Sequence, residues 1–181
     1  MKKYISLCFA VLYVTISYSQ ENKTTKGSVI KDFGQVYKIK NSDLLLDKTK
    51  KYKVIFDVYT DGKSNKKQNT SINTVARFLN MHAQNNIKTQ NLDIVLVLHG
   101  AATKNALSDK AFQREFKIDN PNSKLIKALD KADVKVYVCG QSFAHKGYER
   151  SDLSKNVELS LSALTALVYY QTEGYQLITF N

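Results

Sequence analysis

Residues 134–142 read Val-Lys-Val-Tyr-Val-Cys-Gly-Gln-Ser, an apolar run that ends in a cysteine and is followed by glycine and two polar residues. The run predicts a buried strand, and Gly140-Gln141-Ser142 predicts the start of a short helix that extends to Lys146. Unpaired backbone N–H groups at a helix start favour a thiolate at Cys139. Two interpretations stay open: a reactive sulfur, or a small buried hydrophobe, which is how most free cysteines behave.

Similar apolar runs flank this segment on both sides and alternate with helical patterns. Strands are expected at residues 54–59, 94–98 and 175–180. Helices are expected at residues 72–83, 108–116, 121–129 and 157–171, with Pro121 at the first helical position of the third. This alternation implies right-handed crossovers, so the sequence predicts an α/β fold, a three-layer sandwich with a mainly parallel sheet between helices.

The ligand crevice of an open parallel sheet lies outside the carboxyl ends of its strands. His99 and Cys139 both follow predicted strands, so we expect them at one edge of the sheet, together with Thr60-Asp61-Gly62. An imidazole near a cysteine is typical of an activated nucleophile. The alternative for His99 is a ring hydrogen-bonded to backbone, and His145 either approaches Cys139 or points to solvent.

The candidate residues all belong to these strand ends. The catalytic candidates are Cys139, His99 and His145, and the substrate-binding candidates are Gly100, Gly140, Gln141 and Ser142. Asp57 lies in mid-strand and is interpreted as a hydrogen-bonding residue within the sheet rather than a catalytic one. No cysteine pair, histidine pair at i, i+4, G-x-G-x-x-G or P-loop spacing occurs, so neither a metal nor an organic cofactor is expected.

The N-terminus has the composition of a signal peptide. Lys2 and Lys3 precede an apolar stretch from Tyr4 to Ile16, and Ser17-Tyr18-Ser19 suits cleavage before Gln20. Residues 1–19 are therefore expected to be removed on export to the periplasm or the cell exterior. The stretch is shorter than the ~20 residues that a spanning helix needs, so no stable membrane insertion is expected.

The chain that remains has about 160 residues, enough for one domain with a core. Residues 20–50 are expected to form a flexible lead and an extended arm, and residues 51–181 the α/β domain. Cys8 leaves with the signal segment, so no internal disulfide is possible. The formal charge of +11 is spread as single lysines, and no nucleic-acid-binding motif accompanies it, so no nucleic acid is expected as a partner.

Several motifs in this order and spacing carry a family resemblance. They are Tyr52-Lys-Val-Ile-Phe-Asp-Val-Tyr, Val75-Ala-Arg-Phe-Leu-Asn, Val97-Leu-His-Gly-Ala-Ala-Thr, Asp119-Asn-Pro-Asn, Val136-Tyr-Val-Cys-Gly-Gln-Ser, Leu161-Ser-Ala-Leu-Thr-Ala-Leu and Glu173-Gly-Tyr-Gln-Leu-Ile. From about Val29 to the C-terminus the chain resembles the exported branch of the DsrE/DsrF-like family. The resemblance implies a three-layer α/β fold with flavodoxin-like topology and assembly into trimers or hexamers.

The resemblance also implies a function for Cys139. In the sulfur-relay members of the family, which are cytoplasmic, the corresponding cysteine carries sulfur as a persulfide between partner proteins. We therefore expect an exported protein that binds or transfers sulfane sulfur through a cysteine persulfide, with a sulfur donor or acceptor protein as partner. The alternative is an oligomeric binding or scaffold protein without turnover, in which Cys139 is buried and inert.

Overall fold

The computed structural model describes residues 24–62 and 64–180, so the expected signal segment lies outside the described residues. Its sheet has the strand order β4-β3-β2-β1-β5, and every neighbouring pair is parallel. The strands are β1 (Tyr52–Val58), β2 (Leu92–Leu98), β3 (Lys135–Cys139), β4 (Glu158–Ser160) and β5 (Gln176–Thr179). The α-helices are α1 (Thr70–Gln84), α2 (Asp109–Phe116), α3 (Ser123–Asp130), α4 (Gly140–His145) and α5 (Ala163–Thr172). Short 3₁₀ segments are η1 (Thr89–Asn91), η2 (Gly100–Ala106) and η3 (Arg150–Asp152).

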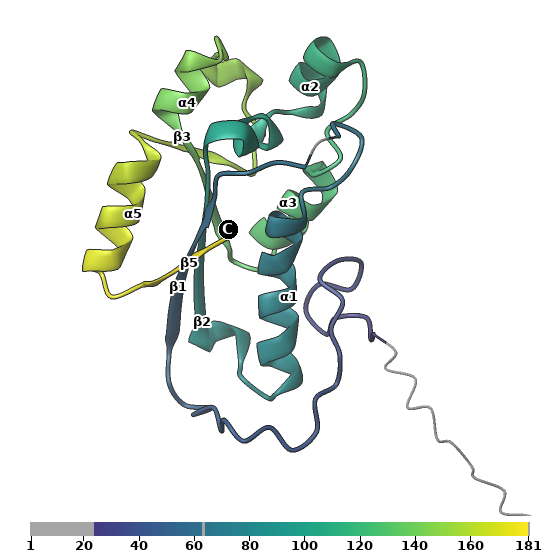
Figure 1. The fold of residues 1–181 in the computed structure, drawn as a ribbon, viewed down its shortest axis with the longest axis vertical. Coiled ribbons are helices and arrows are strands. Elements are labelled where there is room, and N and C mark those ends of the chain that lie inside the picture. Colours follow the sequence, from purple (N-terminus) through teal and green to yellow (C-terminus); the bar gives the residue numbers. More distant parts are fainter. Residues whose placement is uncertain (1–23, 63, 181) are drawn as a thin grey trace, which may run out of the picture.

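The sheet lies between helices, which confirms the predicted fold class. Helices α1 and α3 cover one face and α5 covers the other, while α4 lies above the end of β3 (Figure 1). The topology differs from the flavodoxin expectation in detail, since flavodoxin has the order 2-1-3-4-5. Here β1 to β4 follow one another across the sheet and β5 returns beside β1.

Two apolar clusters fill the two faces, because successive side chains of a strand point to opposite sides. Val54 and Phe56 belong to the larger cluster, which α1 and α3 cover. Ile55, between them, belongs to a smaller cluster on the α5 side. The other buried members of that smaller cluster are Val95, Val97, Cys139, Ala163, Ala166, Tyr170 and Tyr175.

The expected helix over residues 157–171 is wrong in its first third. Glu158–Ser160 forms β4 and pairs with Tyr137–Cys139 of β3. Helix α5 begins only at Ala163, because the Ser162 side chain caps it by accepting the Thr165 N–H at 3.0 Å. The strand is three residues long, too short for its own alternation to stand out beside the apolar helix that follows.

The expected helix start at Pro121 is also wrong. Helix α3 begins at Ser123, and Asn122 is the residue before it. The Asn122 N–H donates to the Asn120 side chain at 2.9 Å, which folds Asn120 to Asn122 into a turn. Pro121 therefore lies in the turn that leads into the helix.

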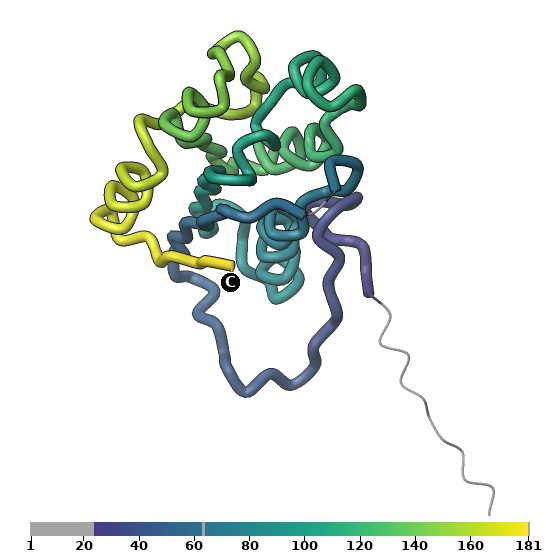
Figure 2. Tube along the Cα trace, turned by 45° about the horizontal axis from the view of Figure 1, so that its top comes forward, coloured from purple at the N-terminus to yellow at the C-terminus, as the bar shows by residue number. Residues whose placement is uncertain are grey.

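The segment before β1 packs on α1 and then swings away from it. Thr25 and Val36 form an antiparallel bridge. The fully buried Asn80 side chain accepts the Val29 and Ile30 N–H groups at 3.2 and 2.9 Å. Residues 37–51 then form an open loop that returns to β1 (Figure 2). No helix within residues 24–62 and 64–180 is both long and apolar enough to cross a membrane.

Candidate functional site

His99 and Cys139 lie at the same edge of the sheet, as the parallel order predicts. Leu98 of β2 pairs with Val138 of β3, so the next residues of the two strands, His99 and Cys139, stand at neighbouring positions. The His99 backbone is still extended, with φ −150° and ψ −178°. The polypeptide therefore continues the strand geometry for one residue beyond β2 and places the imidazole beside the cysteine.

Asp57 of β1 joins them on the same face of the sheet. Asp57 pairs with Val97, and Val97 pairs with Tyr137, so these three residues point to one side. Val97 belongs to the cluster under α5. His99 and Cys139, each two residues further along its strand, point to that side as well. The three strands thus bring a carboxylate, an imidazole and a thiol to the α5 side of the edge.

Asp57 and His99 form a direct contact. The His99 Nε2 lies 2.7 Å from Asp57 Oδ1, and the two side chains are 23% and 18% exposed. This hydrogen bond raises the pKa of His99; burial opposes the rise, and the negative charges of Asp57 and Cys139 add to it. A charged imidazolium is therefore favoured, and the ionised sulfur is one of the groups that favour it.

Cys139 caps helix α4 through its sulfur. The Ser142 N–H donates to Cys139 Sγ at 3.4 Å. Burial is the largest single influence on the thiol and raises its pKa. Hydrogen bonds from the Ser142 side chain and from the backbone of Ser142, Ala163 and Gln141 together outweigh burial, so the pKa of Cys139 is lowered. The side chain is buried, with 5% of the residue exposed, yet its surroundings favour the thiolate.

Gly100 and Gly140 lie where a larger side chain would clash with neighbouring atoms. A Cβ on Gly140 would lie 2.5 Å from the Ser160 carbonyl oxygen, so β4 can approach α4 closely only with glycine there. Gly100 has φ +54°, and a Cβ on it would lie 2.4 Å from the Tyr59 ring. The Gly100 N–H also lies 3.4 Å from Ser142 Oγ, which joins the His99 end of β2 to α4.

His145 lines a surface hollow and is not part of the contact between Asp57 and His99. It is exposed at the end of α4 and lines an open hollow of about 300 Å³. The other residues that line this hollow are Gly100, Gln141, Ser142 and Lys146. Three of the four substrate-binding candidates therefore line one surface hollow with His145, and Cys139 lies behind Ser142 rather than in its wall.

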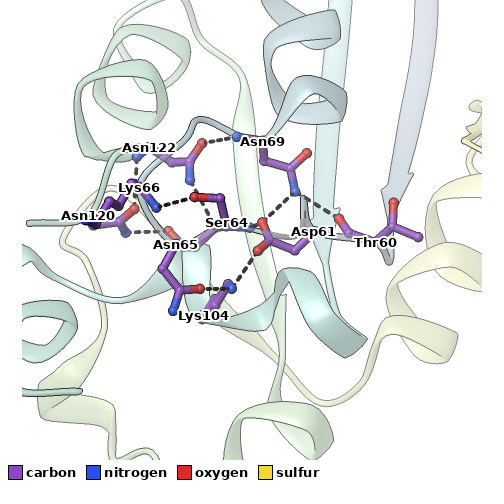
Figure 3. A network of polar contacts seen from close by, with 10 residues as sticks. Thr60, Asp61, Ser64, Asn65, Lys66, Asn69, Lys104, Asn120 and Asn122 are labelled. Carbon is purple, nitrogen blue, oxygen red and sulfur yellow. Dashed lines mark hydrogen bonds and ion pairs between the residues drawn. The ribbon is translucent and has the colours of Figure 1, made fainter. Parts of the chain in front are cut away.

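Asp61 follows β1 and belongs to a different set of polar residues. Its carboxylate accepts from the side-chain amide of Asn69 at 3.2 Å and pairs with Lys104 Nζ at 2.7 Å (Figure 3). It also accepts from the side-chain amide of Asn105 at 3.0 Å. The Asn122 side chain accepts the Asn69 N–H at 2.9 Å and donates to Asn105 Oδ1 at 2.8 Å. We call Asp61, Asn69, Lys104, Asn105, Asn120 and Asn122 the asparagine network. It ties the loop after β1 to η2 and to the starts of α1 and α3.

Sequence reasoning expected Asp57 to hydrogen-bond within the sheet and placed Asp61 at this edge, but it missed the bond between Asp57 and His99 and the contacts of the asparagine network. The signal for Asp57 was a carboxylate between buried apolar residues of a strand, because a charge there needs a partner. The network residues lie in a polar loop, in a 3₁₀ segment and at helix starts, and the sequence held no signal of their contacts. Within residues 24–62 and 64–180, no group of three or more His, Cys, Asp or Glu side chains is placed to hold a metal ion.

The fold and site define a parallel α/β protein with one cysteine at a strand-to-helix junction. The chain belongs to the DsrE/DsrF-like family, whose profile matches residues 53–180. Two solved structures share the fold: protein MTH1491 of Methanobacterium thermoautotrophicum, described as of unknown function, and the ychN protein of E. coli. MTH1491 is 21% identical with a TM-score of 0.54, and ychN is 19% identical with a TM-score of 0.53. Each alignment covers 71% of this chain and 99% of the other. No curated protein matches the chain.

Proposed function

We propose that this chain is an exported protein that binds sulfane sulfur as a persulfide on Cys139 and passes it to an acceptor thiol. The observation that carries the proposal is the environment of the sulfur, in which hydrogen bonds from α4 and its neighbours lower the pKa of Cys139 despite burial. Family membership and a nearby imidazole support it. Export rests on the composition of residues 1–19.

The proposed transfer needs only thiolate chemistry. The Cys139 thiolate attacks the outer sulfur of thiosulfate, a new bond to Sγ forms, the sulfur–sulfur bond of thiosulfate breaks, and sulfite leaves with the electron pair. An acceptor thiolate then attacks the outer sulfur of the persulfide and releases the Cys139 thiolate. The persulfide sulfur is anionic, and His99 in its charged form stabilises it together with the Ser142 N–H.

Mass spectrometry of the treated protein tests this proposal. The full chain is incubated with inorganic polysulfide or thiosulfate, digested and mapped, with Cys8 as an internal comparison thiol. We expect the Cys139 peptide to gain the mass of one sulfur atom, the Cys8 peptide to gain less, and a Cys139→Ser variant to gain none at that peptide. If neither donor adds sulfur to Cys139, the proposal fails.

A binding or scaffold role without turnover is the second candidate. It is favoured by the burial of Cys139, which is 5% exposed among Ile55, Val95 and Val97. The two candidates differ in the accessibility of the sulfur. Alkylation of the native protein at neutral pH that is no faster than that of an unfolded control supports the scaffold, whereas faster alkylation supports the sulfur carrier.

Assembly with further copies of the chain is also part of the proposal. Within residues 24–62 and 64–180, α5 is the one helix that covers its face of the sheet. It presents Leu164, Val168 and Tyr169, which are 77%, 63% and 58% exposed, beside Leu161 at 72%. Large exposed apolar patches usually mark interaction sites, so this apolar surface of α5 is expected to be covered by a second copy of the chain. Sedimentation equilibrium is expected to show a trimer or hexamer. Leu164→Glu is expected to dissociate it, and Gln171→Glu on the same helix to leave it intact.

A further inference from the structure

Asp57 is a charged residue between buried apolar neighbours in β1. Ile55, Phe56 and Val58 around it are at most 1% exposed, while the Asp57 side chain is 18% exposed. A carboxylate so placed is costly unless a partner compensates for the lost hydration. His99 supplies that partner at 2.7 Å, from two positions further along the neighbouring strand. The arrangement therefore exists only because β1 and β2 are in this register.

The bond to Asp57 fixes which ring nitrogen of His99 remains free. An ionised carboxylate can only accept hydrogen bonds, so Nε2 carries the proton that it donates to Asp57. The Nδ1 atom is left as the nitrogen that gains or loses the second proton. The ring also leans against Tyr59, with ring centres 5.3 Å apart at 52°. Its position beside Cys139 is therefore held from two sides.

We propose that Asp57 is a positioning residue that keeps a protonated His99 beside Cys139 and thereby favours the ionised sulfur. The proposal deepens the proposed function where it concerns a persulfide, but its effect on the free thiol is independent of sulfur transfer. Because the charges on His99 and Cys139 favour each other, any change that neutralises His99 must also disfavour the thiolate.

Few other charges of the described residues face this pair. In the part of the chain that the structure describes, the titratable groups placed against His99 are Asp57 and Tyr59 from β1 and its end, and Cys139 from β3. Helix α5 on the same side carries no Asp, Glu, Lys, Arg or His. From α4, His145 and Lys146 line the open hollow that Gly100 shares. Asp57 is thus the acidic residue in contact with His99, and its replacement by asparagine tests the proposal directly.

The experiment measures the rate of iodoacetamide alkylation of Cys139 from pH 5 to 9. The parent is the full chain with Cys8→Ser, so that Cys139 is the remaining thiol. In Asp57→Asn we expect alkylation at pH 7 to slow by about threefold to tenfold and the profile to move to higher pH, since a unit of pKa is a tenfold change in thiolate. NMR titration of Asp57→Asn should show His99 losing its proton at lower pH than in the parent. Asp57→Glu keeps a carboxylate, so its alkylation rate and its His99 titration should lie between those of Asp57→Asn and the parent.

Asp93→Asn is the matched control, because it removes a carboxylate from β2 near the opposite edge of the sheet. Its alkylation profile should equal that of the parent. If Asp57→Asn fails to fold, His99→Gln should give the same slower alkylation at pH 7. An unchanged profile in the folded Asp57→Asn protein, or in His99→Gln, overturns the proposal. If the Asp57→Asn profile is shifted as expected but the parent accepts no sulfur from either donor, only the proposed function is overturned.

Discussion

Two sets of polar side chains lie at the carboxyl edge of the sheet and differ in how completely their groups are paired. In the asparagine network, Asn105 and Asn122 are 1% and 0% exposed, and each side chain bonds to other members. On the α5 side, the side chains of His99 and Asp57 are 23% and 18% exposed, and one ring nitrogen of His99 is free of Asp57. Buried polar groups whose hydrogen bonds are all satisfied make a region rigid. A half-buried histidine next to a thiol can instead gain or lose a proton.

Removal of a central amide should give the largest loss of stability. Asn122→Ala leaves the Asn69 N–H and Asn105 Oδ1 without partners in a fully buried place. We expect the free energy of unfolding to fall by about 3 kcal/mol. Urea denaturation measures it, with Asn156→Ala as the control, because Asn156 bonds to Asp130 at an exposed position. Equal losses in the two variants would contradict the structural role of the network.

Removal of the network's cation should be somewhat less costly. Lys104→Met keeps the length of a side chain that lies over the Phe116 ring but leaves the Asp61 carboxylate, 5% exposed, without its ion pair. We expect a loss of about 2 kcal/mol, reduced from that of a fully buried pair because Lys104 is 18% exposed. When Asp61→Asn is combined with Lys104→Met, part of the lost free energy of unfolding should be recovered. A double variant as unstable as the sum of the two singles would show that the pair is not coupled.

A methyl group at the start of α4, beside the end of β4, should cost about 1–2 kcal/mol. Gly140→Ala places a Cβ 2.5 Å from the Ser160 carbonyl, so β4 must move away from α4. The matched control is Gly62→Ala, where a Cβ meets nothing within 4 Å. Thermal unfolding of both variants measures the difference. A Gly140→Ala protein as stable as Gly62→Ala would show that the close approach is not required.

The pH dependence of stability should give the smallest effect. The fold raises the pKa of His99 above its ordinary value of 6.5, chiefly through the hydrogen bond to Asp57. The stabilisation is therefore complete below that ordinary value and is lost as the pH rises through the raised pKa. The stability difference between the parent and His99→Gln should be larger at pH 5.5 than at pH 9, as urea denaturation at the two values would show. A difference that grows with pH would contradict this assignment.

The sequence predicts the parallel sheet and the shared edge of His99 and Cys139 because long apolar runs and their alternation with helices are local properties. It does not predict β4, since Glu158–Ser160 is too short to show a pattern of its own. The bond between Asp57 and His99 depends on the register of β1 against β2, which is settled only when the whole sheet forms. The asparagine network could not be predicted either, because its members come from four separate segments that meet only when the whole domain folds.

The measurement that tests the central claim most directly is the ionisation of Cys139 itself. Thiolate absorbance near 240 nm is followed against pH in the full chain with Cys8→Ser, with Cys8→Ser combined with Cys139→Ser as the blank. The structure predicts a midpoint below that of an ordinary cysteine, because hydrogen bonds to the sulfur lower the pKa of Cys139 by more than burial raises it. A midpoint at or above that of an ordinary cysteine would contradict the account and leave Cys139 as a buried structural residue.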